Sequence, residues 1–203
     1  AHAHRLTLNI FHGQTTRRGD GQKGVVDYGA APDLKDGIYG QGDAAVSDWE
    51  LYDRRQGKYF TGEAFADCPR KGVPVTHFYL PFSLGWPSRF SQYYEDRQKY
   101  EAEYLKILKD FDQHIAEKGW KRTQFQFFLN GKRKFGEPWD TDEPTRKDDY
   151  DGLRYYGQLL VKALGERKDR RNNIRYRIDI GTYRTTKEQL DGLVDLRVVN
   201  YEV

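Results

Sequence analysis

The sequence predicts an α/β protein of the (β/α)8 TIM-barrel type, present in this chain in partial or incomplete form. From residue 73 onward, strand patterns alternate with amphipathic helix patterns, an order that requires a parallel sheet with right-handed crossovers. No Gly-x-Gly-x-x-Gly motif follows the first strand pattern, and no phosphate-binding loop occurs, which disfavours nucleotide-binding open sheets. The 203 residues fall short of the roughly 250 of a complete barrel.

The N-terminal third combines one strand with a long irregular region. Residues 5–11 alternate apolar and polar side chains at period two, which predicts the first strand. Residues 13–72 contain 11 of the 20 glycines and show little periodicity. We interpret them as a glycine-rich insertion or loop region within a single domain spanning residues 1–203. Two readings of its aromatic residues stay open, a ligand cleft and small satellite cores.

The following segments supply two strand–helix units. Residues 75–82 read as a strand, and residues 92–118 read as a helix whose apolar side chains recur at spacings of three and four. Gly119 follows as a natural helix stop. Residues 123–129 form a strongly apolar strand pattern, and residues 149–166 form a second amphipathic helix.

The last segments continue the alternation. Residues 174–180 alternate as a strand, residues 185–188 (Thr-Thr-Lys-Glu) form a capping box that opens a short helix, and residues 194–199 form a final strand. The sequence lacks methionine, and residues 196–203 read as a strand without a closing element. We therefore expect a processed or incomplete piece of a longer protein.

Composition excludes several classes of function. The net charge of +3 arises from well-mixed charges, and the basic clusters read as solvated loops and helix ends, so we expect no nucleic-acid partner. The single Cys68 excludes an internal disulfide and a multi-cysteine metal site, and we expect no metal and no cofactor. No apolar window is long enough for a membrane span. We expect a secreted, periplasmic or cell-surface protein of bacterial type, with the cytoplasm as the alternative.

Candidate site residues follow from the rule that reactive groups in parallel α/β folds lie past the carboxyl ends of the strands. The segment 130–143 is the richest in such groups. Trp139 offers an apolar platform for a sugar face, and core packing is the alternative role for the aromatic residues near the second strand. The candidate substrate-binding residues are His12, Tyr79, Trp86, Asn130, Trp139 and Tyr201.

Asp142 and Glu143 are the candidate catalytic residues. Pro144 predicts an extended backbone at Glu143, and neighbours in extended chain point to opposite sides. The two carboxylates therefore do not repeat the flanking pair of ordinary glycosidases. They suit two different tasks, in which one donates a proton and the other orients a group of the substrate. The alternative is that an acidic cluster precedes a helix simply because the helix dipole favours it.

The chain resembles glycoside hydrolase family 123 and its uncharacterised relatives. The segments that carry the resemblance are Phe125-Gln-Phe-Phe-Leu-Asn130 and Trp139-Asp-Thr-Asp-Glu-Pro144, and the likeness covers roughly residues 73–203. Its specific element is the Asp-Glu-Pro motif. The resemblance implies a β-N-acetylgalactosaminidase-like barrel with substrate-assisted, retaining catalysis. It also implies that Asp142 orients the 2-acetamido group and that Glu143 is the general acid/base.

Three hypotheses follow. The leading one is a glycosidase that acts on β-linked 2-acetamido sugars, with a glycan or oligosaccharide as its substrate. The second is a non-catalytic carbohydrate-binding or structural barrel module, and the 15% aromatic content suits either. The third is a doubly wound sheet acting on another small ligand. The sugar, the linkage and the oligomeric state are left open.

Overall fold

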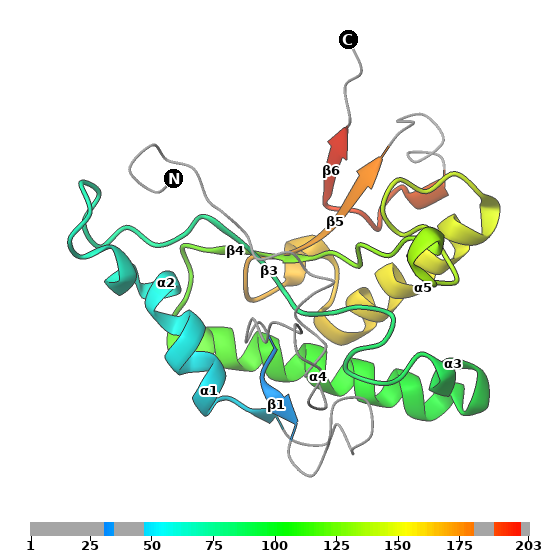
Figure 1. Ribbon diagram of the computed structural model, residues 1–203, viewed down its shortest axis with the longest axis horizontal. Coiled ribbons are helices and arrows are strands. Elements are labelled where there is room, and N and C mark those ends of the chain that lie inside the picture. Colours follow the sequence, from blue (N-terminus) through cyan, green and yellow to red (C-terminus); the bar gives the residue numbers. More distant parts are fainter. Residues whose placement is uncertain (1–30, 35–46, 181–188, 200–203) are drawn as a thin grey trace.

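A four-stranded parallel sheet forms the centre of the computed structural model, which describes residues 31–34, 47–180 and 189–199 (Figure 1). The strands lie side by side in chain order and all pairs are parallel. They are β3 (His77–Tyr79), β4 (Gln124–Phe127), β5 (Ile174–Ile180) and β6 (Leu196–Val199). The α/β class predicted from the alternating patterns is therefore confirmed.

The two long helices cover the same face of this sheet. Helix α4 (Arg97–Lys118) connects β3 to β4, and α5 (Lys147–Leu164) connects β4 to β5. The rings of Tyr104 on α4 and Phe127 on β4 lie 6.3 Å apart, and the Tyr176 hydroxyl on β5 donates to the Leu153 carbonyl of α5 at 2.7 Å. Phe127 and Tyr176 are paired in register, so both helices lie on one face (Figure 1).

This one-sided cover follows from the strand order. When consecutive parallel strands are added in one direction with right-handed crossovers, each crossover helix falls on the same face. A doubly wound sheet, by contrast, carries helices on both faces. The described part of the chain is thus singly wound.

The helix predicted over residues 92–118 is divided in two. A short helix α3 (Ser91–Glu95) ends at Asp96, whose backbone is non-helical at φ −149° and ψ 85°. The Asp96 carboxylate accepts the Lys99 N–H at 3.0 Å and begins α4 anew. At the other end, Gly119 has φ 68°, so the predicted stop is confirmed.

The strands agree with their patterns to different degrees. β5 alternates buried and half-buried side chains along residues 174–180, as predicted. β3 is much shorter than the predicted residues 75–82, although the Leu80 N–H still donates to the Gln126 carbonyl at 2.9 Å. Pro81 has no N–H to continue the ladder. The predicted strand at residues 5–11 and the capping box at 185–188 lie outside the described residues.

The structure corrects the expectation of little regular structure in the later part of residues 13–72. The short strands β1 (Asp33–Leu34) and β2 (Ser47–Asp48) pair antiparallel. Residues 50–65 form four short helical segments, α1 (Glu50–Tyr52), η3 (Asp53–Gly57), α2 (Lys58–Thr61) and η4 (Glu63–Phe65).

The buried aromatic residues of these segments belong to the core. The ring of Phe60 lies 5.1 Å from that of Phe125 on β4, and the ring of Tyr52 lies 5.7 Å from that of Phe111 on α4. The sequence allowed two roles for these aromatic residues, lining a ligand cleft or packing in small cores. In the described helical segments, Tyr52 and Phe60 pack against the main core.

In the part of the chain that the structure describes, no helix has the length and apolar character needed to cross a membrane.

Candidate functional site

The loop between β4 and α5 is closed by contacts between its two arms. The Gly131 N–H donates to the Thr141 hydroxyl at 2.6 Å, and the Gly131 carbonyl accepts the N–H groups of Thr141 at 2.9 Å and Asp142 at 3.2 Å. A Cβ atom at Gly131 would lie 2.9 Å from the Thr141 hydroxyl oxygen, closer than side chains approach. Glycine is therefore needed where the arms meet.

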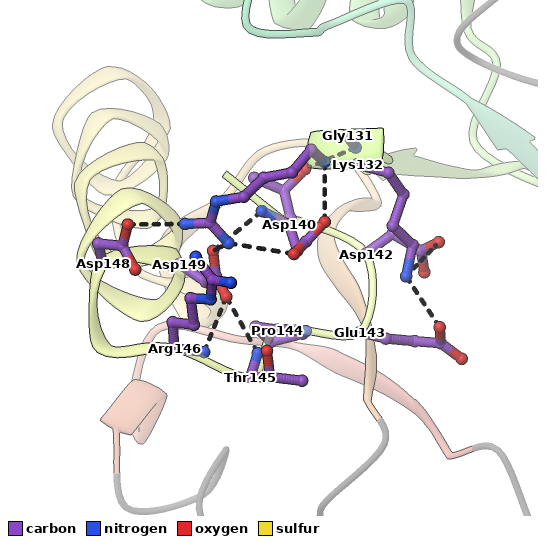
Figure 2. Close-up of polar contacts among 12 residues, drawn as sticks. Gly131, Lys132, Asp140, Asp142, Glu143, Pro144, Thr145, Arg146, Asp148 and Asp149 are labelled. Atoms are coloured by element: carbon purple, nitrogen blue, oxygen red, sulfur yellow. Dashed lines mark hydrogen bonds and ion pairs between the residues drawn. The ribbon is translucent and has the colours of Figure 1, made fainter. Parts of the chain in front are cut away.

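The loop is anchored to α5 through Asp149. This fully buried carboxylate accepts the N–H groups of Arg146 at 2.8 Å, Asp140 at 2.9 Å and Thr145 at 3.1 Å, and it pairs with the Arg133 guanidinium (Figure 2). Burial raises the pKa of Asp149, but these donors outweigh it and hold the pKa below its usual value. Residues 140–146 are thereby fixed against the start of the helix.

Glu143 has a left-handed backbone with φ 56°. Its N–H donates to the Asp179 carbonyl at 3.1 Å, which ties the loop to the carboxyl-terminal end of β5. The extended conformation predicted from Pro144 is therefore wrong. The anchors at Gly131, Asp179 and Asp149 fix the chain on both sides of Glu143 and outweigh the local preference.

The turn at Glu143 lets the two adjacent carboxylates contact one ammonium group. The Lys132 Nζ lies 2.8 Å from Glu143 Oε2 and 3.4 Å from Asp142 Oδ2 (Figure 2). The Asp142 side chain is 21% exposed, and that of Glu143 is 43% exposed. Both carboxylates thus contact Lys132 from the same side of the loop, and Asp142 is more buried than Glu143.

The environment shifts the ionisation of this group. Burial raises the pKa of Asp142, and the negative charges of Asp179 and Glu143 add to that effect, while Lys132 opposes it. Burial lowers the pKa of Lys132, but the hydrogen bond to Glu143 and the charges of both carboxylates outweigh burial and raise it overall. The pKa of Asp142 and the pKa of Lys132 are therefore both raised, the first by burial and the second by its two carboxylate partners.

Polar side chains of three strands meet on the sheet face away from α4 and α5. Arg177 on β5 forms two hydrogen bonds with Asp179, at 2.8 and 3.0 Å. It also donates to the Tyr79 hydroxyl on β3 at 2.7 Å and to Gln126 Oε1 on β4 at 3.0 Å. Asp179 in turn supplies the carbonyl that holds Glu143.

The predicted site residues are distributed unevenly. Asp142 and Glu143 meet at Lys132, Asn130 lies in the same loop with φ 45°, and Tyr79 joins through Arg177. Trp86 is only 1% exposed and packs against Phe82 and Phe111, so its ring has no free face for a sugar. His12 and Tyr201 lie outside the described residues.

Trp139 faces the helices. Its ring lies 5.3 Å from the ring of Phe90 and 5.6 Å from that of Tyr93. A Cβ atom added at Gly152 of α5 would come within 2.8 Å of the indole. The predicted sugar platform is therefore packed against α3 and α5, where it helps to hold the loop.

Sequence reasoning missed Lys132, Arg177 and Asp179. Lys132 belongs to a basic run that reads as a solvated loop, but it follows Asn130 by two residues in the candidate segment. Arg177 and Asp179 occupy the polar positions of the alternating β5 pattern, which place them on the face opposite the core. That alternation was the available signal.

The fold and site define a mixed α/β protein with an acidic pair at the carboxyl ends of parallel strands. Among the described residues, no group of three or more His, Cys, Asp or Glu side chains is arranged to hold a metal ion. Comparison of the chain with protein-family models, with curated proteins and with solved structures finds no match.

Proposed function

We propose that the chain is a glycoside hydrolase that acts on β-linked 2-acetamido sugars by substrate-assisted, retaining catalysis. The observation that carries the proposal is the left-handed turn at Glu143, which directs two adjacent carboxylates to one point. Substrate-assisted glycosidases are exceptions to the rule of two carboxylates flanking the scissile bond. An adjacent pair suits that mechanism.

The arrangement of the sheet supports a barrel-type catalytic domain. Strands added in order, with helices on one face and polar side chains on the other, match a segment of a (β/α)8 barrel. In that fold the helices are outside, and active sites lie at the carboxyl ends of the strands. Asp142 and Glu143 lie in the loop after β4, and Glu143 is bonded to Asp179 near the carboxyl end of β5, which supports the proposal.

The two carboxylates would divide the chemistry. Asp142, the more buried of the two, would accept a hydrogen bond from the acetamido N–H. This would orient the carbonyl oxygen of the acetamido group toward the anomeric carbon. That oxygen attacks, the bond from the anomeric carbon to the leaving oxygen breaks, and Glu143 donates its proton to the leaving oxygen. Water then attacks the cyclic intermediate while Glu143 takes the water proton, so configuration is retained.

Substitution of each carboxylate tests these roles. Glu143→Gln removes the proton donor and is expected to lower kcat by about 10²–10⁴-fold, with the smallest loss for substrates whose leaving group needs no proton. Asp142→Asn is expected to lower kcat for 2-acetamido substrates. Assays use aryl 2-acetamido-β-glycosides. Full activity in both variants would contradict the assignment.

A ligand-binding experiment separates the enzyme from a non-catalytic carbohydrate-binding module. Thiazolines mimic the cyclic oxazoline intermediate, and an enzyme binds such mimics more tightly than its substrate. We expect tight binding to the parent protein in calorimetry and weakened binding to Asp142→Asn. Affinity for intact glycans without affinity for the thiazoline would instead support a binding module.

A further inference from the structure

Lys132 forms an ion pair with Glu143, the proposed proton donor. A general acid must carry its proton when the leaving group departs. An ammonium group 2.8 Å from Glu143 Oε2 favours the carboxylate form instead. The Lys132 side chain is only 17% exposed, so solvent screens this contact less than it would screen a surface ion pair.

The charged residues next to Lys132 and the pair are engaged with other partners. The next residue, Arg133, is engaged by Asp140, Asp148 and Asp149 and anchors the loop to α5. On β5, the negative charge of Asp179 contributes to the raised pKa of Asp142, but the Asp179 carboxylate is engaged by Arg177. The two consecutive basic residues of the loop thus differ in role, since one fixes the backbone and the other contacts both carboxylates.

We propose that Lys132 is a positioning residue that holds Asp142 and Glu143 together in the free protein and keeps Glu143 ionised. Glu143 becomes the proton donor when bound substrate displaces the ammonium group and the carboxylate takes a proton from solvent. The kinetic part of this inference rests on the proposed function, whereas the electrostatic part concerns the free protein alone.

Carboxyl titration of the free protein tests the electrostatic part. Side-chain carboxyl signals of Asp142 and Glu143 are followed by ¹³C NMR against pH, with Asp142→Asn and Glu143→Gln used for assignment. In Lys132→Met the titration midpoint of Glu143 is expected to rise by about one pH unit, because the neighbouring cation is lost while the 43% exposure of Glu143 limits the effect. Lys132→Arg should keep the parent midpoints.

Lys147→Met is the matched control. Lys147 is 84% exposed, and its carboxylate partner is Asp151, so the variant removes the same charge away from the pair. Its midpoints should equal those of the parent. Equal Glu143 midpoints in the parent and in Lys132→Met would overturn the inference.

A reciprocal measurement keeps the inference testable if Lys132→Met does not fold. The amine of Lys132 is followed by NMR in the parent and in Glu143→Gln. Because Glu143 stabilises the ammonium, the amine is expected to titrate at lower pH in the variant. No change would overturn the proposal.

The pH dependence of kcat/KM tests the kinetic part. Loss of the proton from the general acid produces the alkaline limb of the profile. In Lys132→Met this limb should move to higher pH by the amount seen in the titration, and Lys132→Arg should restore its position. If the parent is active and the alkaline limb of Lys132→Met lies at the same pH as that of the parent, this role for Lys132 is contradicted. An inactive parent contradicts the proposed function, and the titrations then still decide the electrostatic part.

Discussion

Glu143 shows how tertiary anchors determine the conformation of a single residue. The sequence identifies the Asp-Glu pair and its place after a strand, and both are found in the structure. It does not reveal the left-handed backbone, because Pro144 argues for an extended one. The hydrogen bond from Glu143 to the Asp179 carbonyl joins residues 36 positions apart, and local rules do not contain such information.

The raised pKa of Asp142 predicts how the free energy of unfolding changes with pH. Burial raises its pKa in the folded protein above the unfolded value, so the folded state binds more protons over that interval. The stability that this carboxyl contributes is present at low pH and declines as pH rises through the raised pKa. Asp142→Asn does not titrate and should therefore lose less stability between about pH 3 and pH 7 than the parent.

Urea unfolding of both proteins across that pH range measures the effect. The free energies of unfolding should converge or cross as pH rises, in favour of the variant. Two curves that run parallel, or a variant that loses relative stability toward neutral pH, would show that Asp142 is not the carboxyl with the raised pKa.

Among the elements, the end of α4 and the bounds of β5 were predicted correctly, whereas the start of α4 and the length of β3 were not. Gly119 ends α4 as predicted because a left-handed cap is a local requirement. The division at Asp96 was missed, because the apolar spacing of α4 and the residues before it form one continuous pattern. β3 is shorter than its apolar run, since strand pairing depends on the partner strand as well as on side-chain pattern.

The start of α5 carries a prediction of its own. Asp149→Ala removes a buried carboxylate that holds three backbone N–H groups and Arg133, and it should lower the free energy of unfolding at pH 7 by about 2–4 kcal/mol. Because the folded pKa of Asp149 is lowered, its contribution is present above the unfolded value of about 3.9 and disappears as pH falls below it.

Denaturant unfolding at pH 7 and at acidic pH measures this contribution. Asp151→Ala is the control, since Asp151 lies on the same helix but forms exposed ion pairs with Lys147 and Arg154. It should change stability little. An equal loss in the two variants would contradict the anchoring role of Asp149.

At the scale of the whole molecule, the order of the elements determines where the site lies. Alternating strand and helix patterns predicted a parallel sheet, and β3 to β6 confirm it in chain order. The one-sided helix cover leaves Tyr79, Gln126, Arg177 and Asp179 to form a polar layer on the other face. The alternation of β5 places Arg177 and Asp179 on that face, but their contacts with Tyr79 and Gln126 were not predicted, because these depend on the register between strands that are distant in sequence.

The most direct test of the account compares kcat/KM for aryl 2-acetamido-β-glycosides whose acetamido methyl carries zero, one, two or three fluorine atoms. Fluorine withdraws electrons from the carbonyl oxygen that is proposed to attack the anomeric carbon. Substrate-assisted catalysis predicts a steep, progressive fall in kcat/KM with each added fluorine. Equal rates across the series, or no hydrolysis of any member, would contradict it.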